Sequence, residues 1–137
     1  MTQDIKFKVR KLLCLLIGSV FLILTTSMNE DTVSSINKCI SEADAQCLSS
    51  FLNTTIEMNV LGNNGYYGKS QAETILISFF KENPPRDFSV KQGGSTSANT
   101  KFSIGTYNTS KESFRIYYVL KKEGNIEKIT KLTIEKR

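Results

Sequence analysis

Few residues in this sequence could carry out chemistry, and their types exclude several catalytic arrangements. The chain has 137 residues and no histidine, so a Ser–His or Cys–His nucleophilic pair cannot form. After residue 27 the only thiols are Cys39 and Cys47, too few for the usual sets of zinc ligands. The glycine-rich run at residues 93–97 lacks the lysine and the following helix of a phosphate-binding loop. We therefore expect a flexible turn there, and no metal, no cofactor and no catalytic residue.

The first 27 residues have the pattern of an export signal. A basic stretch from Lys6 to Lys11 precedes an apolar core from Leu12 to Leu24, and small residues stand at Thr25 and Ser27. This order is typical of a signal peptide cleaved before Met28. A membrane span needs about 20 apolar residues, so an uncleaved membrane anchor is the weaker alternative. We expect residues 1–27 to be a signal peptide and the protein to be periplasmic or secreted.

The charge after the expected cleavage is nearly balanced. Four of the 18 Lys and Arg residues and one of the 13 Asp and Glu residues precede Met28, so residues 28–137 carry a net charge of +2. Such a weak bias gives no reason to expect nucleic-acid binding. A length of about 110 residues fits one domain with one core.

One helix is marked clearly between Gly68 and Asn83. Ser70 and Glu73 fit a capping box, with Gly68 as the alternative cap, and Asn83-Pro84-Pro85 ends the helix. Its apolar residues recur at helical spacing: Ala72, Ile75, Leu76, Phe79 and Phe80.

Two weaker helices precede it, with Asp31 and Ser41 as predicted caps. Cys39 and Cys47 would lie about 12 Å apart on one continuous helix, beyond the reach of a disulfide. Only a break between the helices would allow the bond, so we predict two small buried thiols.

The remaining patterns alternate as strands do. Residues 55–61 predict one strand, the turn Gly62 to Gly65 reverses the chain, and Tyr66-Tyr67 forms a short return strand that leads into the helix. Phe88 and Val90 start another strand, and the last forty residues form an antiparallel meander. Its final strand changes phase near Thr130-Lys131, which predicts a β-bulge.

The register of the meander predicts a surface. With a three-residue loop at residues 110–112, Ile104 pairs with Tyr118, and Phe102 with Leu120, all on the core face. A two-residue loop would place Ile104 opposite Val119. The three-residue loop sets Tyr107 opposite Arg115, and Gly105 opposite Tyr117, on the outer face. Tyr and Arg are enriched at interface hot spots, so we predict that Tyr107, Arg115 and Tyr117 form a partner or homodimer surface. The alternative is a solvated face with a cation–π pair.

The order of helices, hairpin, long helix and meander resembles the cystatin-like fold of the nuclear-transport-factor-two and ketosteroid-isomerase superfamily. Several motifs are similar to a family of small exported Bacteroidota proteins known as domain of unknown function 4783. They are Val60-Leu61-Gly62, Gly68-Lys69-Ser70-Gln71-Ala72-Glu73, Asn83-Pro84-Pro85, Ile104-Gly105-Thr106, Arg115-Ile116-Tyr117 and Leu132-Thr133-Ile134-Glu135. The resemblance implies an α+β cone, in which N-terminal helices and one long helix pack on a curved antiparallel sheet. It implies no activity.

Two functions of different class fit such a fold. The first is a non-catalytic module of the cell envelope that binds a small molecule or a protein. The second is a small isomerase or lyase with its site in the cone mouth. Ketosteroid isomerases use a carboxylate base and a buried tyrosine, for which Glu57 with Tyr66 or Tyr67 would be the candidates. Because Glu57 alternates away from Ile56 and Met58, we expect it to face away from the core and favour the binding module.

Overall fold

The computed structural model describes residues 3–6, 8 and 30–137. Residues 3–6 are helical, and Asp31–Arg137 forms a separate compact unit. Apart from residues 3–6 and 8, the expected signal peptide lies outside the described residues. In the described ranges, no helix has the length and apolarity to cross a membrane.

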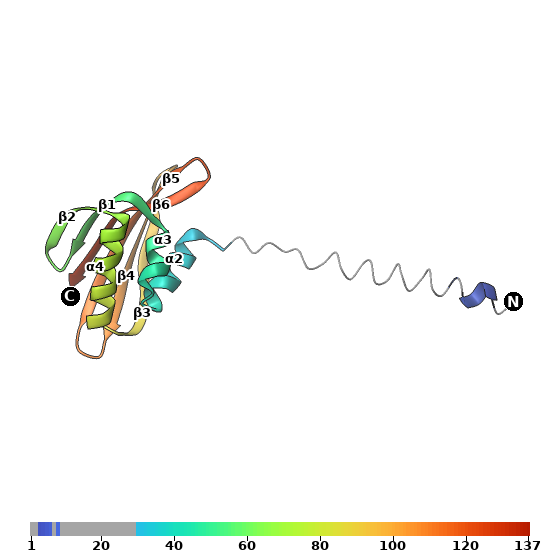
Figure 1. The fold of residues 1–137 in the computed structure, drawn as a ribbon, viewed down its shortest axis with the longest axis horizontal. Helices are drawn as coiled ribbons and strands as arrows, with labels where there is room; N and C mark the ends of the chain where they lie inside the picture. Colours follow the sequence, from blue (N-terminus) through green and yellow to red (C-terminus); the bar gives the residue numbers. More distant parts are fainter. Residues whose placement is uncertain (1–2, 7, 9–29) are drawn as a thin grey trace. The chain divides into compact units, whose positions relative to one another are not determined.

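Asp31–Arg137 is an α+β unit with a single six-stranded sheet. Its elements are α2 (Thr32–Ser41), α3 (Ala45–Ser50), β1 (Leu52–Val60), β2 (Asn63–Gly68), α4 (Lys69–Glu82), β3 (Pro85–Ser97), β4 (Thr100–Thr109), β5 (Ser113–Glu123) and β6 (Ile126–Lys136). The strand order is β2-β1-β6-β5-β4-β3. These three helices lie on one face of the curved sheet (Figure 1). The expected fold class is confirmed, but β1 and β6 run parallel, so the sheet is mixed and not wholly antiparallel.

Helix α4 forms as its apolar spacing predicts. Ala72, Leu76, Phe79 and Phe80 are buried against the sheet, and Ile75 is half-buried. The predicted capping box at Ser70 is wrong. The N-cap is the alternative residue, Gly68, and its N–H donates a 3.4 Å hydrogen bond to the Gln71 side chain. Glu73 instead accepts a 2.7 Å hydrogen bond from Ser49 Oγ and so ties α4 to α3.

The two short helices are separate and joined by a disulfide. Ala43 has a φ of 53°, in the left-handed region, and the second cap is Asp44, whose Oδ1 accepts the Cys47 N–H at 2.8 Å. This break brings the Cα atoms of Cys39 and Cys47 to 5.6 Å, and their sulfurs are bonded. The prediction of two free thiols is therefore wrong, since it depended on a continuous helix.

Two turn predictions also need correction. The β1–β2 hairpin turns two residues earlier than predicted, at Leu61 and Gly62, which both have positive φ. Strand β3 continues to Ser97, so residues 93–97 pair with β4 and are not a free loop. The predicted bulge in the last strand is confirmed, because Thr130 has no partner between Lys131, opposite Val119, and Ile129, opposite Leu120.

The register of β4 against β5 differs by one residue from the prediction. Tyr107 pairs with Phe114, Ile104 with Tyr117 and Phe102 with Val119. Four residues, 109–112, lie between the last paired residues, Asn108 and Ser113. Thr109 organises this connection by accepting the Lys111 and Glu112 N–H groups on its hydroxyl. A one-residue shift moves every side chain to the other face, so Phe102 and Ile104 lie outside.

The core face of β4 therefore carries Ser103, Gly105 and Tyr107. A Cβ atom on Gly105 would lie 2.4 Å from the Phe88 ring, so glycine makes room for that ring. Gly105 does not stand on the outer face beneath Tyr117. Tyr107 is fully buried and donates a 2.6 Å hydrogen bond to the Asn83 carbonyl. This bond links β4 to the end of α4.

Candidate functional site

The sheet face opposite the helices, here called the outer sheet face, carries two kinds of side chain. On β4 and β5 it presents an apolar strip whose four members are half-buried: Phe102, Ile104, Tyr117 and Val119. On β1 and β6 it presents polar and charged groups, among them Glu57, Lys131 and Glu135. None of the three helices of Asp31–Arg137, which are α2, α3 and α4, covers this face (Figure 1).

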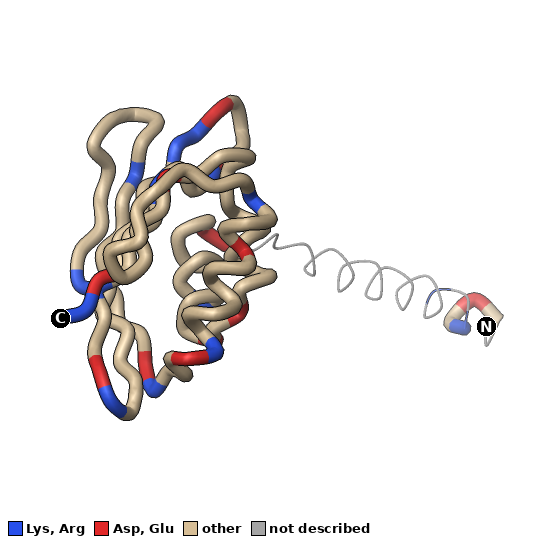
Figure 2. The backbone as a smooth tube through the Cα atoms, turned by 60° about the vertical axis from the view of Figure 1, so that its left-hand side comes forward, with Lys and Arg blue, Asp and Glu red and all other residues tan. Residues whose placement is uncertain are grey.

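Two ion pairs lie on the polar part of the outer sheet face. Lys131 Nζ lies 2.9 Å from Glu57 Oε1, and the hydrogen bond and charge of Glu57 raise the pKa of Lys131. Arg115 lies 3.6 Å from Glu135 Oε2, and its guanidinium carbon is 6.0 Å from the centre of the Tyr117 ring. These groups line a shallow polar hollow of about 300 Å³. Acidic and basic residues are both spread over the hairpins and helices (Figure 2).

Two of the three predicted surface residues lie where they were expected. Arg115 is exposed and Tyr117 half-exposed on the outer sheet face. Tyr107 is not on this face, because the shifted register turns it into the core. Ile104 and Phe102 take its place beside Tyr117. Gly105 is the residue in the sequence that could have indicated this register, since the Phe88 ring needs a neighbour without a side chain on the core face.

The interior of the cone is filled by its own aromatic side chains. The ring of Phe79 lies 5.7 Å from Tyr107 and 5.2 Å from Phe114, and Phe80 lies 5.9 Å from Tyr107. Burial raises the pKa of Tyr107 to about 12. Its hydroxyl is engaged with the Asn83 carbonyl. Among the described residues, no Asp or Glu is buried.

Tyr118 is the second tyrosine with a perturbed hydroxyl. Burial raises its pKa to about 12, and it donates a 2.9 Å hydrogen bond to Asn37 Oδ1 of α2. Both perturbed tyrosines therefore hold helices against the sheet, and neither faces a carboxylate in the core.

The carboxylate–tyrosine pair considered for an isomerase is not assembled in the core. Glu57 faces away from Ile56 and Met58, as expected, and is bound to Lys131. Tyr66 lies opposite Glu57 on the outer sheet face and is 76% exposed. Tyr67 packs against the core on the other side of the sheet. The described part of the chain also has no cluster of three Cys, Asp or Glu side chains suited to a metal ion.

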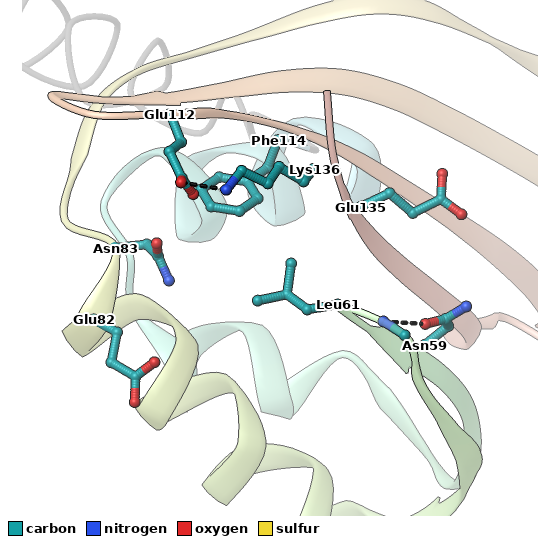
Figure 3. Close-up of a pocket in the computed structure, with 9 residues that line it drawn as sticks. Asn59, Leu61, Glu82, Asn83, Glu112, Phe114, Glu135 and Lys136 are labelled. Atoms are coloured by element: carbon teal, nitrogen blue, oxygen red, sulfur yellow. Dashed lines mark hydrogen bonds and ion pairs between the residues drawn. The ribbon is translucent and has the colours of Figure 1, made fainter.

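The cone mouth, where α4 ends beside the end of β6, is a cavity of about 450 Å³ (Figure 3). Phe114 and Leu61 provide apolar surface, while Glu82, Glu112 and Glu135 provide carboxylates. Lys136 is paired with Glu112. Neither Leu61 nor Glu82 has a sequence pattern that predicts a place in this cavity, since only the folded chain brings the β1–β2 turn to the end of α4.

The comparisons agree on the family and the fold. The family described as "Domain of unknown function (DUF4783)" matches residues 33–135. No curated protein matches the chain. A DUF4783 protein from Bacteroides uniformis is 21% identical with a TM-score of 0.74, and the alignment covers 78% of this chain and 98% of that protein. One from Bacteroides ovatus is 25% identical with a TM-score of 0.72, covering 76% and 94%.

More distant structures share the architecture. A putative dehydratase of the NTF2-like family from Streptomyces avermitilis is 11% identical with a TM-score of 0.59, covering 77% of this chain and 90% of that protein. At this identity the likeness concerns the fold alone. With the family matched over most of the α+β unit, the chain belongs to the DUF4783 family and has the α+β cone fold of NTF2-like proteins.

Proposed function

We propose that this protein is a non-catalytic interaction module of the cell envelope, and that a second copy of the chain docks on its outer sheet face. The observation that carries the proposal is the apolar strip of Phe102, Ile104, Tyr117 and Val119, on a sheet face that α2, α3 and α4 all leave uncovered. The aromatic filling of the cone interior supports a surface site over a buried catalytic one.

The composition of the outer sheet face suits a symmetric interface. An isologous dimer places the same patch of each copy on the other, so apolar side chains can meet near the axis while charges of both signs pair around it. Arg115 and Tyr117 are of the types enriched among hot-spot residues. Their stacking and the bond from Arg115 to Glu135 hold them in place before a partner binds, which lowers the entropy lost on association.

The sheet edges are less suited to pairing with another chain. Edge strands are commonly protected by shortness or by bulges. Strand β2 has six residues, and β3 has three register irregularities along its pairing with β4. The face, and not an edge, is therefore the favoured contact.

The expected location in the envelope agrees with the bonded cysteines. Disulfides persist in oxidising compartments such as the periplasm and are rare in the cytosol. The Cys39–Cys47 bond and the signal-like pattern of residues 1–27 both support export.

Sedimentation velocity tests the proposal on the chain from Met28 to Arg137. We expect a dimer at micromolar concentration, and a monomer for the double variant Arg115→Ser, Tyr117→Ser. The matched control is Ile77→Ser, Lys81→Ser on α4, which also removes one exposed apolar residue and one cation and should remain dimeric. A parent protein that is monomeric at high micromolar concentration would refute the homodimer.

A further inference from the structure

Leu61 occupies an unusual position at the cone mouth. It lies in the β1–β2 turn with a φ of 53°, a conformation that favours glycine, and its side chain is 48% exposed. Its N–H donates to the Ile134 carbonyl at 2.9 Å, which holds the turn against the end of β6. The side chain points into the space between the end of α4 and Phe114 (Figure 3).

Leu61 lines two neighbouring hollows. The cavity of the cone mouth, about 450 Å³, lies on one side and has Phe114 in its wall. A second hollow of about 270 Å³ lies towards α4, with Ile75 and Phe79 in its wall. Leu61 and Glu82 line both, so moving the Leu61 side chain would join them into one cleft, whose mostly polar lining also contains Phe114, Ile75 and Phe79.

The charge around this cleft is negative. Glu82, Glu112 and Glu135 line the cone mouth against a single lysine, Lys136, which is paired with Glu112. Glu135 has Arg115 as its partner. Glu82 has no ion pair with any described residue, and it stands at the C-terminal end of α4, where the helix dipole also favours cations.

From these contacts we infer that the cone mouth is a binding site for a small amphiphilic cation, with its ammonium group at Glu82 and its hydrocarbon chain along Phe114 and Phe79. Leu61 closes the space between the two hollows when the site is empty and is displaced by the hydrocarbon chain. The site is separate from the outer sheet face and does not depend on the proposed homodimer.

Titration of the purified protein with three six-carbon probes tests the charge preference. In low-salt buffer, amide chemical shifts should change with hexylammonium and cluster at Leu61, Gly62, Glu82 and Asn83. Hexanol should bind more weakly, and hexanoate should not bind. Equal binding of hexylammonium and hexanol, or shifts scattered over the surface, would overturn the assignment.

Two variants test the residues. Glu82→Gln should weaken hexylammonium binding by about three- to fivefold, as expected for a partly exposed ion pair, while Glu123→Gln at the tip of the β5–β6 hairpin should leave it unchanged. Leu61→Gly removes the side chain between the hollows and suits the positive φ, so it should fold and bind octylammonium more tightly than the parent. Weaker binding by Leu61→Gly would overturn the role of Leu61, and unchanged binding by Glu82→Gln would overturn the placement of the ammonium group.

Discussion

The location of Tyr107 distinguishes the observed register of β4 and β5 from the register that hydrophobic alternation predicts. In the structure its ring is fully buried among Phe79, Phe80 and Phe114, and its hydroxyl satisfies the Asn83 carbonyl at 2.6 Å. Replacing Tyr107 by Phe keeps the ring and leaves this carbonyl without its partner. The expected loss is about 1–2 kcal/mol of unfolding free energy.

Tyr107→Ala removes the ring as well. Large-to-small changes of a buried aromatic cost about 3–5 kcal/mol through lost burial and cavity formation. If Tyr107 lay on the outer sheet face, both changes would stay within about 0.5 kcal/mol, as for most surface substitutions.

Urea unfolding of the chain from Met28 to Arg137, followed by far-UV circular dichroism, measures these differences. The matched control is Tyr117→Phe, which removes a tyrosine hydroxyl on the outer sheet face and should change stability by less than about 0.5 kcal/mol. A Tyr107→Ala variant as stable as the parent would refute the register and with it the aromatic filling of the cone.

Four further outcomes are expected. Mass spectrometry of the protein isolated from its native cells should show a chain beginning at Met28, and an intact Met1 in membrane fractions would contradict cleavage. Phe80→Ala should lower the unfolding free energy by about 3–5 kcal/mol, which a melting curve equal to the parent's would disprove. Reducing the Cys39–Cys47 bond should destabilise the fold by about 2–3 kcal/mol through the entropy of the opened loop, as measured by urea unfolding with and without dithiothreitol. Burial raises the pKa of Tyr118 from 10.0 to about 12, so its contribution to stability is complete below pH 10 and is lost as the pH rises to 12. The unfolding free energy of Tyr118→Phe should therefore fall less than that of the parent protein between pH 10 and pH 12.

Sequence patterns within a few residues were enough to predict α4 and the bulge in β6. The apolar spacing from Ala72 to Phe80, followed by Asn83-Pro84-Pro85, defines α4 because helix periodicity and proline geometry act within a few residues. The bulge at Thr130 was visible as a change of phase within one strand. The family resemblance extended these local signals to the whole fold.

Tertiary structure alone decided the features that depend on two distant segments. The Cys39–Cys47 bond required the helix break at Ala43, where the sequence has no glycine or proline to predict a break. The register of β4 followed from the Thr109 loop and from the space that Gly105 leaves for Phe88, and a shift of one residue exchanged Tyr107 for Phe102 and Ile104 on the outer face.

The lining of the cone mouth likewise could not be predicted from the sequence. Leu61 and Glu82 are separated by a strand and a helix, and neither has a pattern that marks a site. Sequence periodicity reports which face of an element is apolar, but the neighbours of a turn or a helix end are set by how the whole sheet curves beneath the helices. For this reason the sequence determined the fold of this protein, while the composition of its surfaces and cavities was decided only by the packed structure.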